Sequence, residues 1–259
     1  MQLIPIYPTP QHAAAAASIQ EYFERQVDIE TLLLMGSTAR GKASPESCLD
    51  FLVLVRPEIL ALHRSQLEQN WQAFYTTDPA VREMRQLARF THVDLEFING
   101  IFIPRPHCWV GGADDFELEI GNTLVYSVAL FENSEYLGQL KAHWLPYYAE
   151  PLRQERLAMV RRYCLNNLEH IPSFIRRGLY FQSFNRLYDA FSEFLQALFI
   201  ARLTYPIAYD KWVSEGVAEI LGLPELYTEL VHILEIPHFE SEDIAKRAED
   251  LNRLVDEYL

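Results

Sequence analysis

Cysteine is scarce in this 259-residue sequence, which contains only Cys48, Cys108 and Cys164. The three are widely spaced, odd in number and form no CxxC pair. A disulfide framework or a structural zinc site is therefore not expected, and a reducing compartment is favoured. Long hydrophobic runs are also lacking: none approaches the roughly 20 apolar residues of a membrane span, so no membrane partner is expected. No Lys or Arg precedes Arg25, and the alanines at 13–17 indicate a helix start instead of a signal peptide. We expect a cytoplasmic protein.

Positively charged residues are also few relative to negatively charged ones. Lys and Arg number 22 against 36 Asp and Glu, which gives a formal net charge of −14. Because phosphate contacts need clustered Lys and Arg, a broad nucleic-acid surface is excluded. Local pairs such as Arg161–Arg162 and Arg176–Arg177 keep an RNA-modifying enzyme only as a minor alternative. A cationic small-molecule partner suits the negative field better.

Hydrophobic residues make up 49% of the chain, enough for a sizeable core, and their pattern differs between its two halves. In the first half, short apolar runs alternate with helical spacing. The helices predicted there cover 11–25 and 58–75. The predicted strands cover 28–35, 49–55 and 91–97, with weaker candidates at 101–103 and 123–131. These patterns favour an α/β domain with a mixed sheet over residues 1–135.

The second half shows helical spacing almost throughout. The predicted helices cover 152–170, 173–203, 208–221, 225–234 and 240–258. Prolines fall at the expected helix starts, at Pro172, Pro206, Pro224 and Pro237. The sequence therefore predicts an α+β chain, in which an all-α helical bundle over residues 136–259 follows the α/β domain.

A glycine–serine turn after the first buried strand is the most informative feature. Gly36 lets the backbone approach a ligand closely because it has no Cβ. Ser37 is expected to cap the next helix and to leave backbone N–H groups for a phosphate. Arg40 or Lys42 would add a charged contact. The turn is therefore predicted to bind nucleotide phosphates.

Carboxylates are predicted to face this turn. Cys48 and Asp50 alternate on the returning strand and point the same way, beside Asp94 and Glu96 from a third strand. A phosphate cradle that faces carboxylates is what Mg²⁺-assisted phosphoryl or nucleotidyl transfer requires. Asp50 and Asp94 are the predicted metal ligands, and Asp50, Asp94 and Glu96 the predicted catalytic residues.

The order of these residues is similar to a known family. It runs Gly36-Ser37, ten intervening residues, Cys48-Leu49-Asp50 and, on a later strand, Asp94-Leu95-Glu96. This pattern resembles the nucleotidyltransferase domain of the DNA polymerase β superfamily, particularly its minimal and antibiotic-modifying members. The resemblance implies that Mg²⁺ and a nucleoside triphosphate, ATP first, bind here, and that a nucleoside monophosphate passes to a hydroxyl of a small-molecule or protein acceptor.

The helical half is weakly similar to the C-terminal domains of aminoglycoside and lincosamide adenylyltransferases, over the segments 198–206 and 209–212. That resemblance implies that Tyr205 and Lys211 face the nucleotide. The asparagine usual in those families is missing, and Arg202 stands near its place.

One departure from the family pattern matters most. Cys48 stands where the family has its first metal-binding Asp, and a thiol is a poor ligand for Mg²⁺. The alternative function is therefore a catalytically impaired nucleotide-binding or regulatory protein, antitoxin-like, with a protein partner. We expect Cys48 to be inert, because no histidine is fixed beside it. Without metal spacing, His92, His107 and His143 are expected to be structural or surface residues, and the acidic run at 114–119 is expected to be a solvated loop and strand edge.

Overall fold

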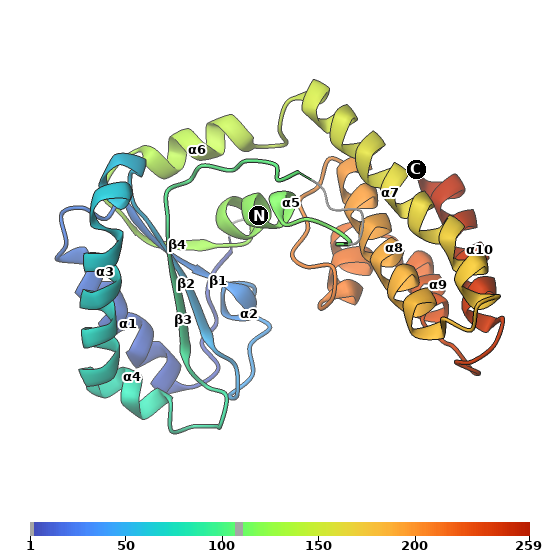
Figure 1. The fold of residues 1–259 in the computed structure, drawn as a ribbon. Helices are drawn as coiled ribbons and strands as arrows, with labels where there is room; N and C mark the ends of the chain where they lie inside the picture. Colours follow the sequence, from blue (N-terminus) through green and yellow to red (C-terminus); the bar gives the residue numbers. More distant parts are fainter. Residues whose placement is uncertain (1–2, 107–110) are drawn as a thin grey trace. The chain divides into compact units, whose positions relative to one another are not determined.

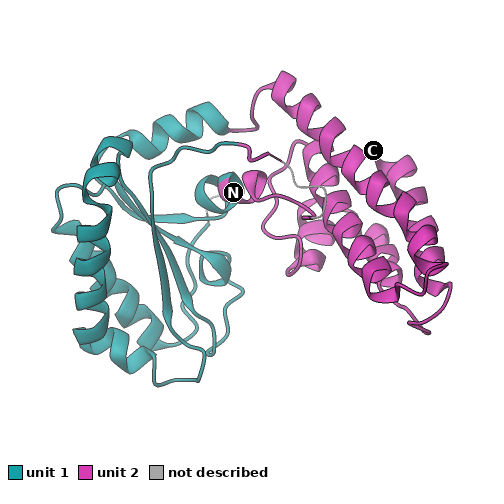
Figure 2. Cartoon of the chain, viewed as in Figure 1, with its two compact units in different colours: residues 1–103, 120–144 teal, residues 104–119, 145–259 magenta. Residues whose placement is uncertain are grey.

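The computed structural model describes residues 3–106 and 111–259, so Cys108 and His107 lie outside the described residues. The chain forms two compact units, one of residues 1–103 and 120–144 and the other of residues 104–119 and 145–259 (Figure 2). It crosses between the units three times, the second time within α5 (Phe116–Ile120). The predicted division into domains of residues 1–135 and 136–259 stays a prediction.

The first unit is built on a four-stranded mixed sheet in the order β3-β2-β1-β4 (Figure 1). Its strands are β1 (Thr31–Met35), β2 (Leu49–Leu54), β3 (Val93–Ile98) and β4 (Val128–Glu132). β1 pairs antiparallel with β2 and with β4, whereas β2 and β3 run parallel. This register places the end of β1 beside the start of β2, where the predicted turn and carboxylates lie.

Helices cover one face of this sheet. α1 (Pro10–Glu24), α3 (Pro57–Thr77) and α4 (Pro79–Met84) lie together on that face in Figure 1. Each begins with a proline in its first turn, where the missing N–H costs no hydrogen bond. Buried aromatic and aliphatic side chains from the helices and the strands form one core, which includes Phe23, Leu34, Phe51, Trp71 and Phe97. The short helix α2 (Gly36–Ala39), the π-helix η1 (Gly121–Val125) and α6 (Tyr136–Trp144) complete the unit.

The second unit is helical. Its long helices α7 (Glu150–Ile175) and α8 (Tyr180–Ala201) pack side by side, and α10 (Asp243–Tyr258) packs on both. α9 (Pro224–Ile233) packs on α10 and on the π-helix η2 (Glu215–Ile220). Phe194, Leu198 and Leu251 are among the side chains fully buried in its core. The predicted α+β class, a mixed-sheet domain with a helical bundle, is confirmed.

Several element boundaries differ from the prediction. The helix expected over 173–203 is broken, because Gly178 adopts a positive φ of 69° and turns the chain between α7 and α8. Pro172 lies inside α7 instead of starting a helix, held by the buried Ile171 and Ile175 beside it. The helix expected over 208–221 is reduced to η2, residues 101–103 form no strand, and β4 starts only at Val128.

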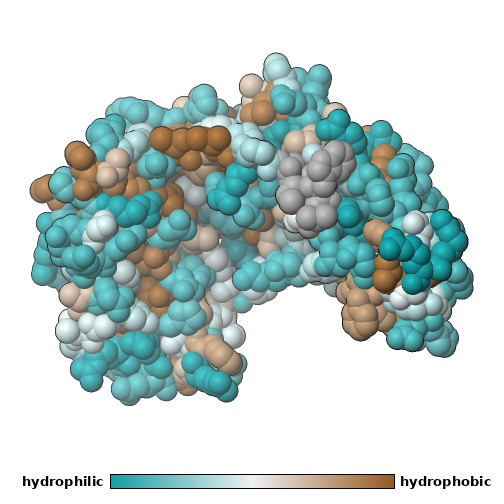
Figure 3. Space-filling view, viewed as in Figure 1, coloured by the Kyte–Doolittle hydropathy of each residue, from teal (hydrophilic) through white to brown (hydrophobic). Residues whose placement is uncertain are grey.

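Hydrophilic residues predominate on the face drawn in Figure 3, and hydrophobic ones occur there in small groups. Exposed large apolar side chains include Val27, Leu62, Ile103 and Phe181. Within residues 3–106 and 111–259, every helix is too short or too polar to cross a membrane.

Candidate active site

The turn after β1 is tight and depends on glycine. Gly36 has φ +68°, a conformation that side chains with a Cβ rarely adopt, and it opens the four-residue helix α2. Met35, not Ser37, is the N-cap of this helix, and no side chain caps it. The prediction that Ser37 caps the helix is therefore wrong: the helix starts at Gly36, two residues earlier than a Ser37 cap requires. The Ser37 side chain lies within the first turn and is half-buried.

Asp50 packs directly against this glycine. The antiparallel register of β1 and β2 pairs Met35 with Asp50. A Cβ on Gly36 would lie 2.1 Å from Asp50 Oδ2 and 3.0 Å from Asp50 Cγ, closer than real Cβ contacts allow. The Asp50 carboxylate therefore occupies the space that the glycine leaves open, and any larger residue at position 36 would displace it.

Asp94 lies beside Asp50 on the neighbouring strand. The parallel register of β2 and β3 pairs Asp50 with Asp94 and Leu52 with Glu96. Paired residues on adjacent strands, about 4.8 Å apart, point to the same face of a sheet. Asp94 and Glu96 are exposed, whereas Val93, Leu95 and Phe97 point to the other face, with Val93 and Phe97 buried and Leu95 half-buried. The structure thus brings Asp50 and Asp94 together and places Glu96 two residues further along the same face.

Two basic residues near the turn have different positions. The Arg40 guanidinium donates through Nη1 to the carbonyl of Gly36 at 3.0 Å, and its side chain is half-buried. The Lys42 backbone N–H donates to the carbonyl of Ser37 at 2.9 Å, and Lys42 itself is exposed. Arg40 therefore stabilises the turn by binding its backbone carbonyl, and Lys42 is the more exposed of the two cations.

His92 joins the site, contrary to the prediction. The thiol of Cys48 lies 3.2 Å from His92 Nδ1 and 3.7 Å from His92 Nε2, and Nε2 lies 3.0 Å from Asp94 Oδ2. Cys48 therefore has a histidine beside it, so the stated reason for calling it inert is wrong. His92 is one residue before β3 and has the same parity as Asp94, which is the sequence signal that could have found it.

Tyr205 and Lys211 belong to the second unit. The Tyr205 side chain is 2% exposed, and its ring centroid lies 4.6 Å from that of Tyr147 and 6.3 Å from that of Tyr148. Burial raises the pKa of the Tyr205 hydroxyl. Lys211 is exposed, in the turn segment that precedes η2. Their assignment as nucleotide-binding residues stays a prediction.

The acidic run at 114–119 is solvated only in part: Asp115 is exposed and Glu119 is half-exposed, whereas Asp114 and Glu117 belong to a buried cluster. Glu117 is fully buried and accepts hydrogen bonds from Arg156 Nε at 2.5 Å, Tyr148 Oη at 2.7 Å and Gln196 Nε2 at 2.8 Å. Arg156 also pairs with Asp114 through Nη2, at 2.7 Å. Burial alone would lower the pKa of Arg156, but Glu117 and Asp114 raise it overall. This cluster holds the segment before α5 to α7 and α8, so these carboxylates do not form an acceptor site on the surface.

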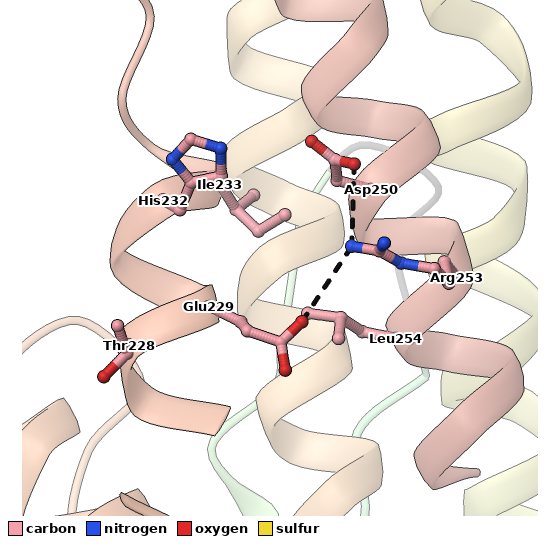
Figure 4. A pocket seen from close by; sticks show the side chains of 7 residues that line it. All are labelled: Thr228, Glu229, His232, Ile233, Asp250, Arg253 and Leu254. Atoms are coloured by element: carbon pink, nitrogen blue, oxygen red, sulfur yellow. Dashed lines mark ion pairs between the residues drawn. The ribbon is translucent and has the colours of Figure 1, made fainter. Parts of the chain in front are cut away.

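A cavity of about 250 Å³ lies between α9 and α10 in the second unit (Figure 4). Figure 4 shows Arg253 reaching between Glu229 and Asp250, at 3.9 Å and 3.6 Å. The other lining residues are Thr228, His232, Ile233 and Leu254. It includes none of the predicted site residues, so this cavity does not mark the predicted site.

Comparison with known proteins agrees with the geometry of the first unit. Residues 17–103 match the family model of the nucleotidyltransferase domain. No curated protein matches the chain. Two solved structures are similar at 15% identity over 95% of this chain. The nucleotidyltransferase-like protein from Exiguobacterium sibiricum has a TM-score of 0.45 over 74% of its length. Spectinomycin adenyltransferase AAD(9) from Enterococcus faecialis, with ATP and spectinomycin, has a TM-score of 0.37 over 98% of its length.

The matched residues 17–103 contain the Gly36 turn, Asp50, His92 and Asp94. They also contain β1, β2 and β3, the three strands that position those residues. The match to the nucleotidyltransferase domain therefore lies within the first unit and includes the predicted site.

Proposed function

We propose that this protein is a Mg²⁺-dependent nucleotidyltransferase that moves a nucleoside monophosphate from a triphosphate, with ATP as the first candidate, to a hydroxyl of a small-molecule or protein acceptor. The observation that carries the proposal is the packing of Asp50 against Gly36, with Asp94 beside it on β3. A carboxylate pair directly beside a glycine turn suits a metal-bound phosphate chain.

Oxygen ligands for Mg²⁺ are available at this turn. Asp50 and Asp94 both offer carboxylate oxygens, the ligands that Mg²⁺ prefers, so these two residues fit the cation and would hold it. Bound there, Mg²⁺ would neutralise phosphate charge and orient the reacting groups. The Cys48 sulfur is not part of this ligand set, because Mg²⁺ binds thiols poorly.

The turn supplies the phosphate contacts. With no Cβ, Gly36 allows the backbone of α2 to approach the phosphates closely, and the Ser37 hydroxyl is not consumed by capping. The bond from Arg40 to the Gly36 carbonyl keeps the turn in one conformation, which limits the ordering cost when the nucleotide binds. Lys42 is the nearby exposed cation for the outer phosphates.

The reaction also needs a proton acceptor. The hydroxyl oxygen of the acceptor molecule forms a bond to the α-phosphorus of the triphosphate. The bond from the α-phosphorus to the oxygen that bridges the α- and β-phosphates breaks, and pyrophosphate leaves. The hydroxyl proton goes to a carboxylate on the exposed face of β3, either Asp94 or Glu96. A cationic acceptor would suit the net charge of −14.

The test is transfer of label from α-labelled ATP in the presence of Mg²⁺ and a panel of hydroxyl acceptors. We expect transfer by the wild-type protein and a loss of at least about 100-fold in Asp50→Asn, since a displaced or missing metal ligand misplaces the reacting groups. Asp28→Asn is the matched control, because Asp28 is an exposed carboxylate of the same unit outside the site. If Asp50→Asn transfers the label at the wild-type rate, the assignment of Asp50 as a metal ligand is refuted.

One observation favours the alternative function of a catalytically impaired nucleotide-binding protein: Cys48 stands where the family pattern has its first metal-binding Asp. On that account the protein binds nucleotide and acts as a regulator without transfer. Calorimetry separates the two, because tight ATP binding that ignores Mg²⁺, with no transfer to any acceptor, supports the regulator. Cys48→Asp adds a carboxylate at that position, and a large gain of transfer would indicate that the wild-type site is impaired.

A further inference from the structure

Three different donor atoms converge at the start of β2 and β3. Cys48 Sγ, a ring nitrogen of His92 and a carboxylate oxygen of Asp94 all lie within 4.8 Å of one another. His92 Nε2 is 3.0 Å from Asp94 Oδ2 and 3.7 Å from Cys48 Sγ. Sulfur, nitrogen and oxygen in one small cluster form a mixed donor set that suits Zn²⁺ and similar cations far better than Mg²⁺.

Parallel strand pairing produces this convergence. Cys48 immediately precedes β2 and His92 immediately precedes β3, and the strands are paired from Leu49 and Val93 onward. The backbone N–H of Leu49 donates to the carbonyl of His92 at 3.0 Å, which fixes the two chain segments beside each other. The sheet therefore fixes the backbone positions of the three residues, while the His92 and Asp94 side chains remain partly exposed.

The orientation of the His92 ring is also fixed. Its Nδ1 lies 2.5 Å from the carbonyl oxygen of Phe90, which can only accept a hydrogen bond. A proton on Nδ1 would satisfy this carbonyl and leave Nε2 for a cation. Nε2 lies 3.0 Å from Asp94 Oδ2 and 3.7 Å from Cys48 Sγ, and the sulfur is nearer to Nδ1, at 3.2 Å. A histidine that donates one ring N–H to a backbone carbonyl and turns the other nitrogen to its partners has the arrangement found around protein-bound metals.

The sulfur–nitrogen and nitrogen–oxygen separations are close to those of tetrahedral coordination, and all three donor atoms lie within 4.8 Å of one another. Bonds of about 2.3 Å to sulfur and about 2.0 to 2.1 Å to nitrogen and oxygen, at a tetrahedral angle, separate sulfur and nitrogen by about 3.6 Å and nitrogen and oxygen by about 3.3 Å. The distances in the structure are 3.7 Å and 3.0 Å. The His92 and Asp94 side chains are 44% and 62% exposed, which leaves the fourth position open to water or a ligand.

We propose that Cys48, His92 and Asp94 bind a thiophilic divalent cation, with Zn²⁺ as the reference ion. Asp94 is shared between this cation and the oxygen-preferring one proposed at Asp50. The replacement of the family's first Asp by Cys48 would then change which cation the domain binds at this position, from an oxygen-preferring to a thiophilic one. The site stands on its own donors and does not require that the protein transfers nucleotides.

The test uses the metal alone with the full-length, metal-free protein. We expect one equivalent of Zn²⁺ to bind by calorimetry, and Co²⁺ to give an absorption band from thiolate-to-cobalt charge transfer. Cys48→Ser should abolish this band, and His92→Gln should weaken Zn²⁺ binding by at least about tenfold, the lower end of the losses seen even for supporting residues of metal sites. A proton on Nε2 in place of a metal would give an ordinary His92–Asp94 ion pair, with no band and no binding.

Matched controls separate this site from other thiols and histidines. Cys108→Ser and His63→Gln should keep both the band and the affinity, since His63 is an exposed histidine on α3. Asp50→Asn should also keep the band, so failure of the transferase proposal and failure of this site are seen separately.

X-ray absorption at the zinc edge needs no variant and covers the case in which a substituted protein does not fold. One sulfur neighbour at about 2.3 Å supports the site. An all-oxygen shell, or a cobalt band that survives in Cys48→Ser, overturns it.

Discussion

Replacement of Gly36 by alanine tests the geometry of the site most specifically. The added Cβ would lie 2.1 Å from Asp50 Oδ2, so the carboxylate must move or the turn must open. Position 36 also has φ +68°, which disfavours any residue with a Cβ. Gly36→Ala therefore imposes two separate penalties, a backbone strain and a displaced metal ligand.

The two penalties have different magnitudes and different readouts. The positive φ costs about 1–2 kcal/mol in the free energy of unfolding. Gly178→Ala carries the same strain at φ +69°, but no atom lies within 4 Å of its Cβ, so it is the matched control for strain alone. The displacement of Asp50 affects function, because a shift of about 1 Å in a positioned group costs about 100-fold in rate.

Urea unfolding and Mg²⁺-dependent transfer from α-labelled ATP measure the two effects in the same preparations. We expect both variants to lose about 1–2 kcal/mol of stability, and only Gly36→Ala to lose about 100-fold or more in transfer. A Gly36→Ala protein that is folded and transfers at the wild-type rate would refute the placement of Asp50 at the reaction centre. Equal losses of transfer in both variants would show that strain alone explains the effect.

The remaining predictions concern the buried cluster of the second unit. Glu117→Ala leaves Arg156 buried with only part of its pairing and should cost about 3–5 kcal/mol in chemical denaturation, against less than about 1 kcal/mol for Glu119→Ala in an exposed pair. Burial raises the pKa of Tyr148 and of Tyr209 above the ordinary value of 10.0. The folded state therefore keeps protons that the unfolded state releases, and stability should fall as the pH rises above about 10, by about 1.4 kcal/mol per pH unit for each tyrosine. Denaturation titrations between pH 8 and about 11 measure this slope, and a flat profile would contradict the burial of these hydroxyls.

Much of the first unit could be predicted because its signals are local. The apolar run before Gly36 and the alternation from Leu49 identify two buried strands, and the alternation around Asp94 identifies a third. Glycine at position 36 was predicted to allow a close approach, and the structure shows Asp50 against it. These inferences need only the side-chain periodicity of a strand and the missing Cβ of glycine.

Features that depend on partners far apart in the sequence could not be predicted. The parity of His92 indicates that it shares a face with Asp94, but its contact with Cys48 also needs the parallel register of β2 and β3, which the sequence does not specify. Glu117 was interpreted as solvated because its partner Arg156 lies in a different helix, and an acidic run alone does not reveal a buried ion pair. The turn at Gly178 was missed because a single glycine in a helical pattern is usually tolerated.

The central claim is that the Gly36 turn, Asp50 and Asp94 together hold a metal-bound nucleotide. A crystal structure with Mg²⁺ and a non-hydrolysable ATP analogue tests it most directly. The account predicts phosphates against the backbone of Gly36 and Ser37, and a metal ion ligated by oxygens of Asp50 and Asp94. A nucleotide bound away from this turn, or a metal ion that neither carboxylate contacts, would contradict it.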